Sequence, residues 1–163
     1  MKTLLTLRHA KSSWADAGMA DHDRPLNNRG KRDAPRMGRL IAELALHPDI
    51  VLSSTAKRAR STAKRVVEAA GFTCPLELLD HFYLAPPDSY IDELRQQSPD
   101  CERILVIGHN PGLEQLVATL TDTYESLPTA ALVRIDFDIE SWAELPGEPK
   151  GQLQGVWRPK EMA

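Results

Sequence analysis

The chain begins with MKTLLTLRHA (residues 1–10), in which a short apolar run ends on two adjacent basic side chains, Arg8 and His9. The continuous run at residues 4–7 is typical of a strand that is buried on both faces of a sheet. Similar runs occur at residues 50–52, 76–79 and 104–107. These four segments predict a parallel sheet, with Arg8 and His9 at the end of its first strand.

Amphipathic patterns separate these runs. Apolar residues at helical spacing predict a first helix over residues 34–45 and a second over residues 56–70, which Gly71 would end. The first pattern consists of Ala34, Met37, Ile41, Leu44 and Ala45, and the second of Ala56, Ala59, Ala63, Val66, Val67 and Ala70. Strand and helix therefore alternate, as in α/β proteins.

The second half of the chain continues the pattern. Shorter helices are predicted over residues 89–97 and 111–120, the latter with Asn110 as its N-cap. Residues 131–137 alternate apolar with charged side chains and predict a strand with one wetter face near the sheet edge, and residues 152–157 predict a last strand. Residues 11–27 show no period, and a loop of that length is often a functional cover.

Composition limits the possible classes of protein. The chain of 163 residues is 42% hydrophobic and 26% charged, with a net charge of −3. We therefore expect one globular domain spanning residues 1–163. No apolar run approaches the roughly 18 residues of a membrane span, and the net charge gives no general attraction for nucleic acid. Residues 1–7 lack a secretory leader, so we expect a cytoplasmic protein, and nothing indicates a dimer rather than a monomer.

Four basic or potentially basic side chains are predicted at one edge of the sheet. Ligands of open α/β sheets bind at the carboxyl ends of the strands. Arg8 and His9 end the first strand, Arg58 opens the helix after the second, and His109 follows the fourth. Two histidines beside two arginines at strand ends indicate an anion site, whereas a single histidine there would more often serve packing.

Arg58 adds to this prediction. With Thr55 as N-cap, Arg58 would lie in the first helical turn, where the helix dipole disfavours positive charge. A bound anion would relieve that conflict. The alternative is that Arg58 belongs to a solvated basic helix face formed with Lys57, Arg60, Lys64 and Arg65.

A metal site is the competing interpretation of the histidines. Arg8 beside His9 would repel a divalent cation, and no Cys, Asp or Glu lies at ligand spacing from His9 or His109. Cys74 and Cys101 are far apart and are expected to serve packing. We therefore expect neither a metal nor another cofactor.

Three motifs resemble the histidine phosphatase superfamily: Leu7-Arg8-His9-Ala10, Ser53-Ser54-Thr55-Ala56-Lys57-Arg58-Ala59 and Gly108-His109-Asn110-Pro111-Gly112. Residues 8–14 and the segment Asp23-Arg24-Pro25-Leu26 resemble its SixA-type phosphohistidine phosphatases. The resemblance spans roughly residues 1–137. It implies a phosphoglycerate mutase-like fold, a three-layer α/β/α sandwich with a mostly parallel central sheet.

The resemblance also implies roles for single residues. His9 would become phosphorylated, while Arg8, Arg58 and a protonated His109 would hold the phosphoryl oxygens. Ala10 departs from the Gly that the superfamily usually has at that position. The general acid of larger relatives aligns only with Asp80, which could instead end a strand or cap a turn; Asp16 and Glu77 are further candidates.

The expected function is that of a metal-independent phosphohydrolase with a phosphohistidine intermediate on His9, acting on phosphohistidine of a partner protein. A phosphatase of small phosphoesters is the first alternative, and a non-catalytic phosphate-binding adaptor domain is the second. A mutase ranks behind the phosphatases, because a chain this short has little room for the insertions that build a closed pocket. The loop of residues 11–27 is expected to decide which substrates enter.

Overall fold

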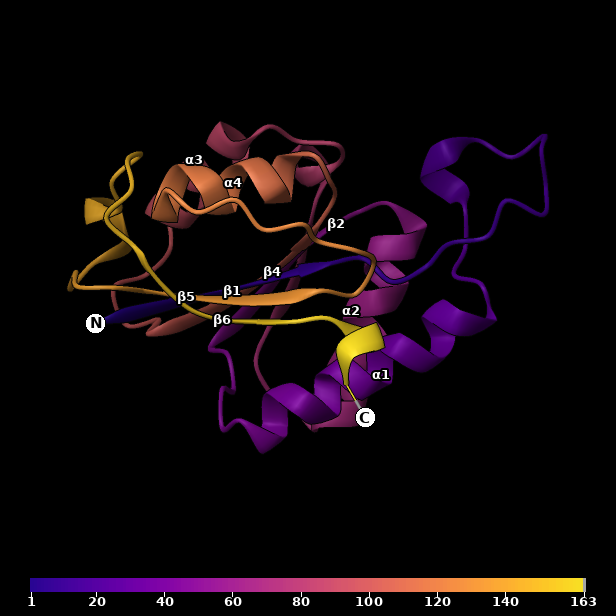
Figure 1. Ribbon diagram of the computed structural model, residues 1–163, viewed down its shortest axis with the longest axis horizontal. Coiled ribbons are helices and arrows are strands. Elements are labelled where there is room, and N and C mark those ends of the chain that lie inside the picture. Colours follow the sequence, from indigo (N-terminus) through magenta and orange to yellow (C-terminus); the bar gives the residue numbers. More distant parts are fainter. Residues whose placement is uncertain (163) are drawn as a thin grey trace.

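The computed structural model describes residues 1–162 and is built on a six-stranded sheet in the order β3-β2-β4-β1-β5-β6 (Figure 1). The strands are β1 (Lys2–Arg8), β2 (Ile50–Ser54), β3 (Leu76–Leu79), β4 (Arg103–Gly108), β5 (Leu132–Phe137) and β6 (Gln152–Trp157). The first four run parallel to one another, whereas β5 is antiparallel to β1 and β6 is antiparallel to β5. The prediction of a mostly parallel sheet is therefore confirmed.

Helices cover both faces of this sheet. They are α1 (Asn28–Glu43), α2 (Lys57–Ala70), α3 (Pro87–Arg95) and α4 (Gly112–Thr121), with short 3₁₀ turns η1 (Asp21–Asp23), η2 (Asp80–Phe82), η3 (Trp142–Glu144) and η4 (Pro159–Glu161). Figure 1 shows α3 and α4 on one face, and α1 and α2 on the other. Within residues 1–162, no helix has both the length and the apolar character needed to cross a membrane.

The continuous apolar runs arise because the inner strands are buried on both faces. Along β4, Ile104 and Val106 belong to the core beneath α3 and α4, while Leu105 and Ile107 belong to the core beneath α1 and α2. Successive side chains of a strand point to opposite faces, so a strand between two helical layers needs no polar alternation. The three layers expected from the resemblance follow from this packing.

Two sequence predictions about burial and helix length are wrong. Glu77 and Leu78 are exposed, because β3 is an edge strand rather than one covered on both faces. The first helix ends at Glu43, so Leu44 and Ala45 lie beyond it and are exposed. Leu46 is the buried residue there, and the chain reaches it by turning at Ala45, whose φ is +57°.

Helices α1 and α2 pack closely against each other. A Cβ atom on Gly38 of α1 would lie 2.5 Å from the backbone oxygen of Val66 in α2. At the start of the same helix, a Cβ on Gly30 would lie 2.2 Å from the backbone oxygen of Lys11. The two glycines therefore allow α1 to contact both α2 and the beginning of the loop at residues 11–27.

Candidate active site

The register of two adjacent strands brings the predicted histidines together. Arg8 at the end of β1 pairs with Gly108 at the end of β4. The next residues, His9 and His109, leave the sheet side by side, and the His9 amide donates to the Gly108 oxygen at 3.1 Å. Their ring centroids are 5.1 Å apart. The two histidines therefore meet although they are far apart in the sequence.

His9 is buried and its ring is held in one tautomer. Nδ1 lies 2.9 Å from the backbone oxygen of Ala10. A carbonyl oxygen can only accept a hydrogen bond, so Nδ1 must carry the proton and Nε2 is left with a free electron pair. Burial is the main cause that lowers the pKa of His9 to about 3, and repulsion between a protonated His9 and the neighbouring His109 and Arg58 lowers it further. At neutral pH the ring is an uncharged base and a nucleophile.

His109 is also buried, and its Nε2 lies 2.8 Å from the hydroxyl oxygen of Ser54 at the end of β2. Burial, followed by the charge of Arg58, lowers the pKa of His109 to about 3. In this structure the His109 ring is therefore uncharged at neutral pH, because a second buried cation beside Arg58 is costly. A protonated His109 stays a prediction for the site with a phosphoryl group bound.

The start of α2 places Arg58 near the histidines, although not through the cap that the sequence predicted. Ala56, and not Thr55, is the N-cap, and it makes no side-chain capping bond. The Thr55 hydroxyl instead lies 3.1 Å from Nε2 of His22. Arg58 lies in the first turn, as predicted, and is buried there, so it adds positive charge where the helix dipole is already positive.

The beginning of α4 differs from the prediction too. The helix starts at Gly112 with Pro111 at the N-cap position, after a cis bond between Asn110 and Pro111. The Asn110 side chain does not cap the helix but donates to the backbone oxygen of Leu127 at 2.7 Å. Arg8 also donates to that oxygen, at 3.0 Å. The loop before β5 is therefore tied to the site by two side chains.

Asp21 supplies the anion that the start of α2 lacks. Arg58 donates through Nη1 to the Asp21 backbone oxygen at 2.8 Å and through Nη2 to its carboxylate at 3.0 Å. Arg24 donates to the same carboxylate at 3.0 Å, and the Tyr83 hydroxyl donates to it as well. These bonds, that from Tyr83 most of all, lower the pKa of Asp21 to about 2. Asp21 is therefore ionised at neutral pH and orients both arginines.

A cavity of about 200 Å³ brings the four principal predicted residues together. Its lining consists of Arg8, His9, Lys11, Ser12, Trp14, Arg24, Arg58, Leu84, His109, Asn110 and Thr129. No Asp or Glu is among these lining residues. Asp80, the predicted acid, is exposed on the first residue of η2, and Asp16 and Glu77 are exposed too.

The sequence placed Asp21 and Arg24 in the loop expected to decide which substrates enter, but it did not predict their contacts with the phosphate pocket, or the part that Tyr83 takes in it. All three lie outside the regular helices and strands, where no periodicity shows which side chains point inward. The run of polar residues in the loop gave the only signal, and it did not distinguish Arg24, which is buried, from its exposed neighbour Asp23.

Comparisons with known proteins show the family and the fold. Residues 4–82 match the histidine phosphatase superfamily (branch 1). An uncharacterised chloroplastic protein of Arabidopsis thaliana is 32% identical over 170 residues, which cover 97% of this chain and 78% of that protein. The crystal structure of a candidate phosphohistidine phosphatase SixA from Agrobacterium tumefaciens matches with a TM-score of 0.84 and 27% identity, covering 97% of this chain and 98% of the other.

A further solved structure, the protein histidine phosphatase SixA complexed with tungstate, matches with a TM-score of 0.83. It is 21% identical and covers 98% of each chain, which shows a shared fold. The fold class that the sequence resemblance implied is confirmed by these matches.

Proposed function

The chain belongs to the histidine phosphatase superfamily, branch 1, and we propose that it is a metal-independent phosphohydrolase with His9 as the nucleophile on phosphorus. One observation carries the proposal. The Nδ1 proton of His9 is held by the Ala10 oxygen, so an uncharged ring offers its Nε2 electron pair within a cavity lined by Arg8, Arg24 and Arg58.

In the first step, Nε2 of His9 attacks phosphorus in line with the leaving group. The new N–P bond forms as the old bond breaks, and the leaving group departs with the electron pair. The imidazole becomes positive, and the hydrogen bond from Nδ1 to Ala10 stabilises that charge. In the second step, water attacks the phosphohistidine and restores His9, releasing phosphate.

The cations of the cavity stabilise the phosphoryl oxygens. Arg8 and Arg58 carry fixed charge, and both are anchored by backbone oxygens, which limits the reorganisation needed during the reaction. His109 is uncharged at neutral pH in this structure, but an approaching phosphoryl dianion raises its pKa. The protonated ring of His109 then donates an N–H hydrogen bond to the anion.

The chemistry of the leaving group favours phosphohistidine on a protein as the substrate. An alkoxide leaving group needs a proton donor. The cavity lining contains no carboxyl group, and Asp21 beside it is ionised and already accepts bonds from three side chains. In a phosphohistidine, the other ring nitrogen can take a proton from water. The leaving group is then a neutral imidazole, which needs no proton donor from the enzyme. Asp80 stays a prediction as the acid, and small phosphoesters are the alternative substrates.

Steady-state kinetics test the proposal. Wild-type protein and His9→Ala would be compared in EDTA on a histidine-phosphorylated protein and on para-nitrophenyl phosphate. We expect phosphate release in EDTA, a higher kcat/KM for the phosphohistidine protein, and a loss of at least about 1,000-fold in the variant.

Three outcomes would contradict the proposal. Activity that disappears in EDTA would indicate a metal enzyme. A higher kcat/KM for para-nitrophenyl phosphate than for the phosphohistidine protein would favour the small-phosphoester alternative. In that case, a variant Asp80→Asn that loses part of its activity on para-nitrophenyl phosphate alone would identify Asp80 as the general acid. Binding of phosphate without any release from either substrate would favour the adaptor domain.

A further inference from the structure

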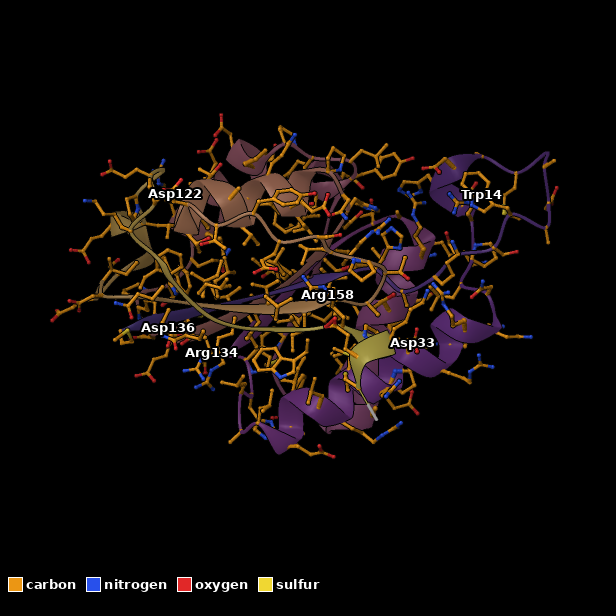
Figure 2. All side chains as sticks on the ribbon, viewed as in Figure 1. Trp14, Asp33, Asp122, Arg134, Asp136 and Arg158 are labelled. Atoms are coloured by element: carbon orange, nitrogen blue, oxygen red, sulfur yellow. The ribbon has the colours of Figure 1, made fainter. Side chains whose placement is uncertain are left out.

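Two exposed apolar side chains stand at the rim of the candidate active site. Trp14 is 71% exposed and Leu84 is 56% exposed, and both line the cavity that holds His9 and His109. Trp14 belongs to the long loop after β1, and Leu84 follows η2. In Figure 2 the loop with Trp14 projects from the end of the molecule opposite to Asp122.

The indole of Trp14 is exposed, but its ring stacks on the guanidinium of Arg24. The guanidinium carbon of Arg24 lies 3.4 Å from the centroid of the ring. Arg24 is itself buried and donates to the Ser13 backbone oxygen at 3.2 Å, to the Asp21 carboxylate and to the Ser12 hydroxyl. A large apolar surface is therefore presented to solvent in an ordered state, which reduces the entropy lost when a partner binds it.

Leu84 raises the free energy of the unbound protein for two reasons, its backbone conformation and its exposure. Its φ is +50°, in the left-handed region that Gly or Asn adopts more easily than leucine. Its side chain is mostly exposed, so burial in the core does not offset the strain. Strain of this kind at the edge of a site is a reason to look for function.

The size of the cavity indicates what these side chains meet. About 200 Å³ is less than the roughly 300 to 1,000 Å³ of pockets that enclose a whole small ligand. A phosphoryl group fits among the cations, but the group attached to it must extend across the rim. Trp14 on one loop and Leu84 on the other are the exposed apolar side chains that line this rim.

We propose that Trp14 and Leu84 bind the apolar surface around the phosphorylated histidine of a partner protein, and so select protein substrates over small phosphates. This inference rests on the proposed function and assigns its specificity to two residues that do not take part in the chemistry. Tryptophan is among the residues most enriched in binding hot spots, and Leu84 at the same rim adds apolar contact area.

Trp14→Ala and Leu84→Asn test the inference, measured on a histidine-phosphorylated protein and on phosphoimidazole. We expect Trp14→Ala to lower kcat/KM for the protein about tenfold or more, through KM, and to lower kcat/KM for phosphoimidazole by a much smaller factor. Leu84→Asn should lower kcat/KM for the protein in the same way, without lowering the Tm, because Asn tolerates the left-handed backbone.

Two matched controls accompany these variants. Tyr124→Ala removes an aromatic side chain that is 70% exposed and does not line the cavity. Ala45→Asn makes the corresponding change at a remote residue with a φ of +57°. Neither control should alter kcat/KM for either substrate.

Equal losses on both substrates would overturn the inference, since they would mean that the rim only supports the phosphate pocket. Unchanged turnover of the phosphorylated protein would overturn it too. In both cases the proposed function would stand, because phosphoimidazole is still hydrolysed. Absence of turnover of either substrate by the wild-type protein would overturn the proposed function, and this inference with it.

Discussion

The hydrogen bond from His9 Nδ1 to the Ala10 oxygen determines which ring nitrogen can react. Arg58 has an equally defined position, because its two Nη groups bind the backbone and the carboxylate of one residue, Asp21. A lysine could not make both bonds from one planar group. The chemistry of the site therefore depends on orientation at single residues as well as on charge.

Asp21 is expected to be a positioning residue. In Asp21→Asn the anchor of Arg58 and Arg24 loses its charge, so kcat/KM for a phosphohistidine substrate should fall about tenfold to 100-fold. The free energy of unfolding should change little, because the Asp21 side chain is 42% exposed. Burial and Asp21 together raise the pKa of Tyr83, so the variant should also titrate Tyr83 at lower pH, as tyrosinate absorbance would show. A loss confined to phosphoesters with poor leaving groups would instead identify Asp21 as a proton donor.

At this scale, Arg8, His9, Arg58 and His109 could be predicted from the sequence, because each follows or precedes a recognisable strand or helix. Asp21 and Tyr83 could not, because their positions depend on how two irregular segments fold onto the start of α2. The lowered pKa of His109 could not be predicted, because the sequence does not show that the ring is buried.

The first turn of α2 carries a conflict between stability and anion binding. Lys57 is exposed there, and no acidic residue occupies the turn. We expect Lys57→Glu to raise the free energy of unfolding by about 0.3 to 1 kcal/mol through the helix dipole, and to weaken inhibition by inorganic phosphate. Lys64→Glu, the same charge change at an exposed position further along α2, is the control. Urea unfolding and phosphate inhibition measure the two effects, and stronger phosphate binding in Lys57→Glu would contradict the proposed role of this turn.

The contact between α1 and α2 depends on Gly38. A Cβ atom there would lie 2.5 Å from the Val66 oxygen, so Gly38→Ala should lower the free energy of unfolding by about 1 to 3 kcal/mol. In Gly18→Ala the added atom would lie 3.6 Å from its nearest neighbour, and we expect little change. Equal stability of the two variants in urea would show that α1 shifts without cost.

Helix and strand positions followed from periodicity, but helix starts did not. Thr55 and Asn110 have the side chains of good N-caps, yet both are used elsewhere, by His22 and by Leu127. Tertiary contacts at the site outweighed local capping preference at both helices.

Across the whole molecule, two buried uncharged histidines couple folding to pH. The pKa of His9 and that of His109 are lowered from about 6.5 to about 3, chiefly by burial. Between these values the unfolded chain binds more protons than the folded one, so stability is complete above about pH 6.5 and is lost as the pH falls. Each histidine contributes a slope of up to about 1.4 kcal/mol per pH unit.

We therefore expect the free energy of unfolding to decrease between pH 7 and pH 5, and to decrease less in a His9→Asn/His109→Asn double variant. His47→Asn, at an exposed histidine, is the control. Inorganic phosphate should reduce this decrease in the free energy of unfolding of the wild-type protein, because an anion stabilises the protonated rings of His9 and His109. Identical pH slopes for the wild type and the double variant would contradict this coupling.

At the scale of the whole molecule, the centre of the sheet was easier to predict from the sequence than its edges. Four apolar runs indicated the parallel strands, and three of these, β1, β2 and β4, form the buried part of the sheet that carries the site. Their spatial order was not predictable, because β1 lies between β4 and β5 only through long-range pairing. The exposure of β3 was missed for the same reason.

The most direct test of His9 as the nucleophile is to trap the reaction on a histidine-phosphorylated protein within milliseconds and to locate the phosphoryl group by mass spectrometry and ³¹P NMR. We expect a transient phosphohistidine at His9, bonded through Nε2, because Nδ1 is engaged by the Ala10 oxygen. A phosphoryl group on Nδ1 or on another residue, or full turnover by His9→Ala, would contradict it.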